Sequence, residues 1–154
     1  MGVADLKEST HPRATIATVG LGSCLGVTCY DPARRTGALL HAMLPRFSKY
    51  REFSPVEAMY LDTGISALLA VMVRLGSNPR HCEFKVFGGA QVMRACEYFK
   101  IGEQNIAAMR AIAAEQRLDV RAWEVGGSNN RSITLHLETG LVGLRQPNRA
   151  EAML

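Results

Sequence analysis

A cysteine that directly follows a glycine-rich bend is the first candidate for chemistry in this sequence. Cys24 comes after the bend at residues 20–23, between predicted strands at residues 14–19 and 25–30. Such a bend lifts a sulfur off a sheet, and the amide groups around Gly22 and Ser23 are placed to stabilise an oxyanion. Because a free cysteine is more often a small core residue, a nucleophile and a structural thiol both remain open on this feature alone.

A histidine on the next predicted strand supports the nucleophile. A hairpin turning at residues 31–34 places Tyr30 opposite Arg35, and counting outward then places Cys24 opposite His41. Directly opposed residues have Cβ atoms about 4.5–5.5 Å apart. A register shift of two residues would keep the pair on one face, whereas a shift of one would separate it. An imidazole in that position activates a thiol and protonates a leaving group, although a buried histidine in an apolar strand is the competing interpretation.

Thr18 is the predicted third member of this group. It lies on the strand that enters the bend, where its hydroxyl could orient the imidazole of His41. The alternative is a β-branched residue present for its strand propensity. Further along the chain, Gly88 and Gly89 either let the backbone approach a substrate closely or simply end a strand.

The elements that must position these residues alternate between strand-like and helix-like patterns. Ser54, Pro55 and Glu57 form the pattern of a helix start, with an N-cap, a first-turn proline and a capping box. Strands are predicted at residues 14–19, 25–30, 37–44, 82–87, 118–125, 132–138 and 141–145, and helices at 55–75, 90–99 and 103–116. This order predicts an α/β (mixed α+β) fold, with mixed β-sheet layers covered by helices.

Length and composition indicate one ordinary globular domain. The 154 residues are 47% hydrophobic and 21% charged, which predicts a single domain over residues 1–154 with flexible ends at 1–13 and 146–154. The formal net charge is +4, and no dense basic run suggests nucleic acid. No apolar run reaches the roughly 18 residues of a membrane span, and the polar first residues do not resemble a signal peptide, so we expect a cytoplasmic protein without membrane insertion.

The four cysteines are expected to be free thiols, because the cytosol keeps thiols reduced. Cys24 and Cys29 are spaced as C-x4-C, but no C-x2-C pair repeats, so no metal site is predicted. Basic residues flank both ends of the predicted hairpin and are suited either to steering an acidic partner or to an ordinary solvated surface. They are Arg34, Arg35, Arg46, Lys49 and Arg51.

From residue 15 to residue 145 the sequence resembles the CheD family of bacterial chemotaxis proteins. The motifs that carry the likeness are G-S-C at residues 22–24, H-x-M-L-P at 41–45 and K-x-F-G-G-A at 85–90, in that order. Ile101-Gly102 with Asn105, and Gly126-Gly127 with Arg131, also match. One departure lies in residues 128–130, where a glycine is expected; the asparagines are predicted to keep the turn by adopting positive φ.

The resemblance implies a function. Members of the family convert the side-chain amide of particular chemoreceptor glutamines to glutamate and release ammonia, and methylesterase activity is also ascribed to them. Carried over by position, Cys24, His41 and Thr18 act together, with the turn at Gly22 and Ser23 holding the oxyanion. No cofactor is implied. The fold is expected to resemble the catalytic domain of deamidating bacterial toxins, and the partners are expected to be methyl-accepting chemoreceptor helices and a CheC-type phosphatase.

Three other functions stay open from the residues alone. One is a module that binds and regulates a chemotaxis phosphatase without catalysis, and another is a cysteine peptidase that cleaves main chain. A thiol redox sensor would use Cys24 and Cys29, but strand alternation places those residues on opposite faces and argues against an easy disulfide.

Overall fold

The computed structural model describes residues 1–50, 54–91 and 100–154. Most of the helix predicted at residues 90–99 lies outside the described residues. Arg51 and Cys96 also lie outside them. The strands are β1 (Asp5–Ser9), β2 (Thr15–Leu21), β3 (Leu25–Asp31), β4 (Thr36–Ala42), β5 (Glu83–Gly88), β6 (Asp119–Val125), β7 (Arg131–His136), β8 (Val142–Arg145) and β9 (Ala152–Met153). The helices are α1 (Phe47–Tyr50), α2 (Leu61–Arg74) and α3 (Ile101–Gln116), with 3₁₀ turns η1 (Glu57–Met59) and η2 (Pro79–His81).

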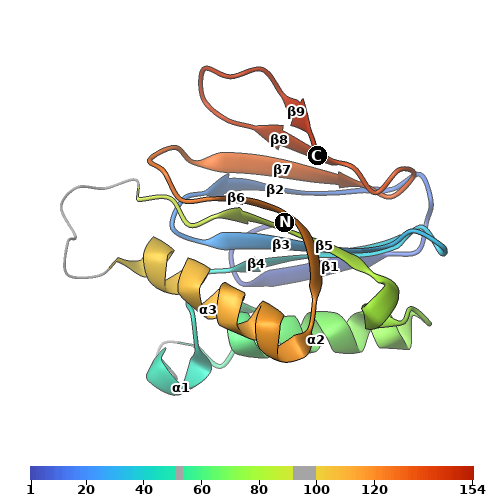
Figure 1. Ribbon diagram of the computed structural model, residues 1–154, viewed down its shortest axis with the longest axis horizontal. Helices are drawn as coiled ribbons and strands as arrows, with labels where there is room; N and C mark the ends of the chain where they lie inside the picture. Colours follow the sequence, from blue (N-terminus) through green and yellow to red (C-terminus); the bar gives the residue numbers. More distant parts are fainter. Residues whose placement is uncertain (51–53, 92–99) are drawn as a thin grey trace.

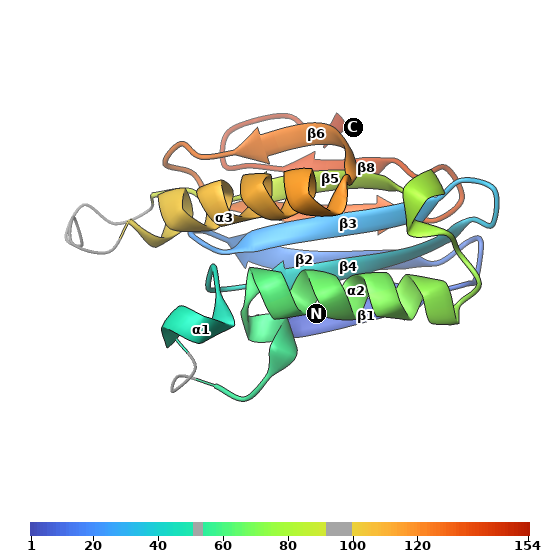
Figure 2. The ribbon, with the colours of Figure 1, turned by 60° about the horizontal axis from the view of Figure 1, so that its bottom comes forward.

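Three layers make up the structure (Figures 1 and 2). The central layer is a five-stranded sheet in the order β1-β4-β3-β5-β6, mixed because β5 and β6 are parallel and its other pairs are antiparallel. Helices α2 and α3 cover one face of it, and a four-stranded sheet in the order β2-β7-β8-β9 covers the other. The predicted mixed α+β fold is confirmed, while the expected likeness to a toxin domain stays a prediction.

The central strand β3 is buried along its whole length because both faces of its sheet are covered. Leu25, Val27 and Cys29 belong to the apolar cluster under the helices. Tyr30, on the alternate face, belongs to the cluster between the two sheets. This is the alternation that the sequence predicted, and it determines which side chains of neighbouring strands share a layer.

Helix α2 begins at Leu61, so the predicted start at Pro55 is wrong. The chain before the helix pairs with the end of β4 instead: the N–H groups of Met43 and Leu44 both donate to the Met59 carbonyl, at 3.0 and 2.9 Å. The Tyr60 hydroxyl also donates to the Ser54 carbonyl at 2.9 Å. These tertiary hydrogen bonds outweigh the local capping pattern, which is worth about 1 kcal/mol.

The hairpin between β3 and β4 differs from the prediction by two residues. Asp31 pairs with Thr36, and Gly26, not Cys24, pairs with His41. A two-residue loop needs positive φ at its first position, which Pro32 cannot adopt. The loop is therefore longer: the Asp31 carboxylate accepts from the amides of residues 33 and 34, and Arg35 takes a φ of 51° before β4 begins.

Both ends of the described chain contain strands that the sequence did not predict. Strand β1 pairs with β4 along its full length, and β9 pairs with β8. The flexibility predicted for residues 1–13 and 146–154 stays a prediction. Within the described parts of the chain, no helix is both long enough and apolar enough to cross a membrane.

Candidate active site

Cys24 and His41 face the same side of the central sheet, toward the second sheet. Cys24 immediately precedes β3, is partly exposed, and packs against the apolar cluster between the sheets. His41 lies on β4 with 1% of its surface exposed. Because Gly26 is the residue opposite His41, Cys24 is its diagonal neighbour. The prediction that Cys24 lies directly opposite His41 is therefore wrong. The two residues still share a face, because the register shift is an even number of residues. Diagonal neighbours of this kind typically lie about 7–8 Å apart.

Thr18 reaches His41 from the other sheet. Its Oγ1 lies 2.8 Å from His41 Nδ1 and 3.1 Å from the Met1 carbonyl oxygen. A carbonyl only accepts, so both contacts are satisfied together when the hydroxyl donates to Met1 and accepts from Nδ1–H. This arrangement corresponds to the neutral tautomer of His41 with its hydrogen on Nδ1. Its Nε2 is left with a lone pair and has no hydrogen-bond partner among the described residues.

Burial shifts the pKa of both groups toward the uncharged state. The pKa of His41 is lowered mainly by burial and further by the N-terminal ammonium, while Asp5 opposes the shift. Burial raises the pKa of the Cys24 thiol, and its own backbone N–H partly offsets that effect. Both shifts favour an uncharged thiol and a neutral imidazole over a thiolate–imidazolium pair.

The turn at Gly88 and Gly89 holds the backbone of residues 22–24, which are called the cysteine loop below. The N–H of Gly89 donates to the Cys24 carbonyl at 2.8 Å, and that of Ala90 donates to the Gly22 carbonyl at 2.8 Å. Gly88 has a φ of 108°, and a Cβ at this position would overlap the Cys24 carbonyl. The close backbone approach predicted for these glycines therefore exists, but it is to the cysteine loop itself; their contact with a substrate stays a prediction.

Arg131 links its own turn, at residues 126–131, to Gly88. Its guanidinium donates to the carbonyls of Gly126 at 2.8 Å, Asn129 at 3.2 Å and Gly88 at 3.4 Å. Positive φ in this turn belongs to Gly126 and Gly127, at 80° and 73°, and not to the asparagines. The prediction that asparagine keeps the turn is thus wrong, because the glycine pair already supplies the two unusual conformations.

One residue at the site received no role from the sequence. Asn105 on α3 is fully buried, and its side chain contacts the backbone on either side of the candidate pair. Two signals were available: Asn105 is one of the residues that match the family, and it is a single asparagine on the helix face that otherwise carries Gly102, Ala108, Met109, Ile112 and Ala113. A buried amide among apolar residues requires hydrogen-bond partners, and the sequence does not say where they lie.

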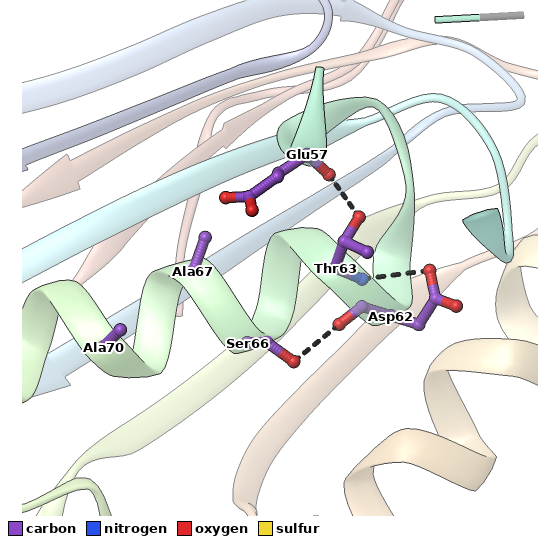
Figure 3. Close-up of a pocket in the computed structure, with 6 residues that line it drawn as sticks. All are labelled: Glu57, Asp62, Thr63, Ser66, Ala67 and Ala70. Carbon is purple, nitrogen blue, oxygen red and sulfur yellow. Dashed lines mark hydrogen bonds between the residues drawn. The ribbon is translucent and has the colours of Figure 1, made fainter. Parts of the chain in front are cut away.

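A hollow of about 510 Å³ on the outer face of α2 contains none of the predicted site residues (Figure 3). Its polar groups are used locally: Thr63 Oγ1 donates to the Glu57 carbonyl at 2.6 Å, and Ser66 Oγ donates to the Asp62 carbonyl at 2.9 Å. The Asp62 carboxylate accepts from the backbone N–H of Phe47 at 3.0 Å. These contacts stabilise the start of α2 and do not form a catalytic group.

The described cysteines differ in their surroundings. Cys29 and Cys82 are buried free thiols under the helices, whereas Cys24 faces the second sheet. The prediction that Cys24 and Cys29 lie on opposite faces is confirmed, which weakens the redox-pair alternative. Within residues 1–50, 54–91 and 100–154, no cluster of three His, Cys, Asp or Glu side chains is suited to a metal ion.

A partly exposed thiol and a hydrogen-bonded imidazole thus lie on one side of the covered sheet. Residues 43–146 match the sequence model of the family described as "CheD chemotactic sensory transduction". The chain belongs to the CheD family. The matched range begins after Thr18, Cys24 and His41, so the likeness at these three positions depends on longer matches.

Individual relatives provide those longer matches. The chain is 35% identical over 156 residues to the "Chemoreceptor glutamine deamidase CheD" of Halalkalibacterium halodurans, covering 98% of this chain and 94% of the relative. It is 36% identical over 141 residues to a probable chemoreceptor glutamine deamidase of Thermococcus kodakarensis, covering 90% and 86%. The corresponding protein of Pyrococcus horikoshii is 40% identical over 134 residues, covering 85% and 82%.

Proposed function

We propose that this protein is a cysteine-dependent amidohydrolase that converts specific glutamines of chemoreceptors to glutamate and releases ammonia. The observation that carries the proposal is the setting of His41: its Nδ1 is hydrogen-bonded to Thr18, while its Nε2 is buried without a hydrogen-bond partner among the described residues, on the face shared with Cys24. The names of the relatives supply the substrate class. The proposed site is Cys24 as nucleophile, His41 as base and acid, and Thr18 as the residue that orients the imidazole.

The proposed reaction has two halves. His41 Nε2 takes the proton of the Cys24 thiol as the sulfur bonds to the δ-carbon of the glutamine amide, forming a tetrahedral oxyanion. The imidazolium then gives that proton to the leaving nitrogen, the carbon–nitrogen bond breaks, and ammonia departs from a thioester. Water attacks the thioester with Nε2 again as base, and the thiol is regenerated as glutamate leaves.

Backbone amides of the cysteine loop are the proposed oxyanion donors. The carbonyls of Gly22, Ser23 and Cys24 are each fixed by a hydrogen bond from another segment. Because each peptide unit is planar, fixing these carbonyls also fixes the direction of the following N–H groups. Preorganised donors of this kind typically contribute about 10²–10³ in kcat.

Substitution of the nucleophile tests the proposal. We expect purified Cys24→Ala to release no ammonia from a chemoreceptor fragment and to produce no glutamine-to-glutamate conversion by intact-mass analysis. Cys82→Ala is the matched control, since Cys82 is a buried thiol under the helices, and it should keep turnover. Ammonia release by Cys24→Ala at the wild-type rate would reject the mechanism.

The same assay separates the other activities. Hydrolysis of a glutamate methyl ester follows the same thioester path with methanol as the leaving group, so a methylesterase activity belongs to this proposal. Cleavage of the receptor main chain in place of ammonia release would identify a peptidase. Binding of a CheC-type phosphatase and a cytoplasmic location remain parts of the proposal, and a non-catalytic regulatory role would be indicated by phosphatase binding without any turnover.

A further inference from the structure

The strands that carry the candidate pair separate beside it. The last ladder pair between β3 and β4 is Leu25 with Ala42. Two steps further, the same register would pair Ser23 with Leu44, but the Leu44 N–H donates to the Met59 carbonyl at 2.9 Å and the Leu44 carbonyl accepts from the Leu61 N–H at 2.9 Å. The end of the histidine strand is thus bonded to the segment around the start of α2 and not to the cysteine loop. The ladder therefore does not itself fix the distance between the cysteine loop and the end of the histidine strand.

Asn105 spans this separation with one side chain. Its Nδ2 donates to the Ser23 carbonyl at 2.9 Å and to the Met43 carbonyl at 2.9 Å. Ser23 directly precedes Cys24, and Met43 lies two residues after His41. Both partners are carbonyls, which only accept, so the amide must present its NH₂ group to them. Asn105 therefore ties the two strand ends together where backbone pairing stops.

The helix that carries Asn105 packs closely on the glycine turn at residues 88–89. A Cβ on Gly102, one turn earlier in α3, would lie 2.6 Å from the Gly89 carbonyl oxygen and 3.1 Å from that of Ala90. The first turn of α3 therefore rests directly on the same glycine turn that holds the cysteine loop. Asn105 is itself 0% exposed, and its Oδ1 has no hydrogen-bond partner among the described residues.

We infer that Asn105 is a positioning residue for the Cys24–His41 pair, because its amide links the backbone of the cysteine loop to the end of β4. It makes no hydrogen bond to either side chain and acts through the backbone of Ser23 and Met43. An apolar residue of similar size would pack on this helix face without needing partners, whereas an amide there provides both donors. The inference rests on the proposed function only for its effect on turnover; its effect on the thiol is independent of substrate.

Site-resolved alkylation of Cys24 with iodoacetamide tests the inference without a substrate. The benchmark is His41→Ala, which removes the proposed base and should slow Cys24 alkylation near neutral pH by about ten-fold. We expect Asn105→Asp, which keeps the size but replaces the NH₂ donors with oxygen, to lose most of the same reactivity. Its kcat for ammonia release should fall at least as far, with KM changed by less than about three-fold.

Ile112→Ala is the matched control. Ile112 lies two turns further along the same buried face of α3 and contributes to the cluster under the helices, so its truncation lowers stability without touching Ser23 or Met43. We expect this variant, where folded by circular dichroism, to alkylate Cys24 at the wild-type rate. An equal loss of reactivity in Ile112→Ala would overturn the inference, as would wild-type reactivity in Asn105→Asp.

The remaining outcomes are also decisive. If Asn105→Asp does not fold, Asn105→Ala replaces it in the same comparison. Failure of both to fold, under conditions where Ile112→Ala folds, would show that Asn105 supports the whole fold and would overturn the narrower role. A wild-type protein that releases no ammonia would reject the proposed function, yet a selective loss of Cys24 reactivity in the Asn105 variant would still support positioning.

Discussion

The side chains of Thr18 and His41 come from different sheets and meet through a hydrogen bond of 2.8 Å. Thr18 lies on β2 of the four-stranded sheet, and His41 lies on β4 of the five-stranded sheet. The tautomer and orientation of the imidazole therefore depend on how the two sheets pack. A side chain held across a layer boundary is sensitive to small displacements of the sheets, whereas a partner on the same strand would be fixed by the backbone alone.

Removing the Thr18 hydroxyl should lower turnover without changing the size of the side chain. Thr18→Val leaves Nδ1–H of His41 buried without an acceptor, and an unmade hydrogen bond of this kind costs about 1–3 kcal/mol. We expect kcat for ammonia release to fall by about 10-fold or more, since roughly 1.36 kcal/mol corresponds to ten-fold in rate. Thr18→Ser keeps the hydroxyl and should remain within a few-fold of wild type; equal losses in both variants would contradict an orienting role.

The pH dependence of kcat/KM should reveal the neutral imidazole. His41 accepts a proton only when it is uncharged, and burial lowers its pKa below the ordinary value of 6.5. Activity should therefore persist at pH 6.5 and fall only at lower pH, as the folded enzyme binds a proton at His41. An acid limb centred above this ordinary value would instead indicate a resting thiolate–imidazolium pair.

The lowered pKa of His41 also makes the folding stability depend on pH, so the pH profile of kcat/KM needs a control for unfolding. Because the folded-state pKa of His41 is lowered, the unfolded chain binds more protons below pH 6.5. The contribution of His41 to stability is thus full above that pH and is lost as pH falls toward the folded-state value. Circular dichroism at each pH separates loss of fold from protonation of the base.

A methyl group at Gly88 should disturb both the fold and the site. Gly88 has a φ of 108°, and its added Cβ would overlap the Cys24 carbonyl, so Gly88→Ala should lower the free energy of unfolding by more than about 2 kcal/mol. Gly127→Ala is the control: its φ is 73°, but the nearest side-chain atom would lie 4.0 Å from the new Cβ. It should lose about 1 kcal/mol, the conformational cost alone, in urea denaturation. Similar losses in the two variants would show that contact with the cysteine loop is unimportant.

Lys85 should matter for stability more than for turnover. It is 8% exposed, and its ammonium donates to the carbonyls of Gly140 at 2.9 Å and Leu154 at 2.7 Å. Lys85→Met keeps the chain length but removes both donors, so the free energy of unfolding should fall by about 1–3 kcal/mol. The exposed Lys7, paired with Asp5 at 3.4 Å, is the control, and Lys7→Met should change stability by less than about 0.5 kcal/mol. An unchanged stability of Lys85→Met would contradict the role of these bonds.

Much of the fold was predictable because its signals are local. The strand pattern at residues 25–30 matches β3, and the pattern at 103–116 matches most of α3. The helix start at Pro55 was not predictable in the same way, since the capping pattern there competes with pairing to the end of β4. Strand β1 was also missed: it pairs with β4, which is distant in sequence, and its own residues alternate only weakly.

For the candidate site too, some features were predictable from the sequence and others depended on tertiary packing. The residue types and their shared face follow from the amino-acid order alone, because a period of two places Cys24 and His41 on one side for any even register. Packing of the layers set the register through the longer loop at Arg35, brought Thr18 to His41 from another sheet, and placed Asn105 between two strand ends. The physical reason is the separation along the sequence of the residues that interact. Side-chain alternation is a property of a single strand, whereas hydrogen bonds between segments distant in sequence form only when the layers pack.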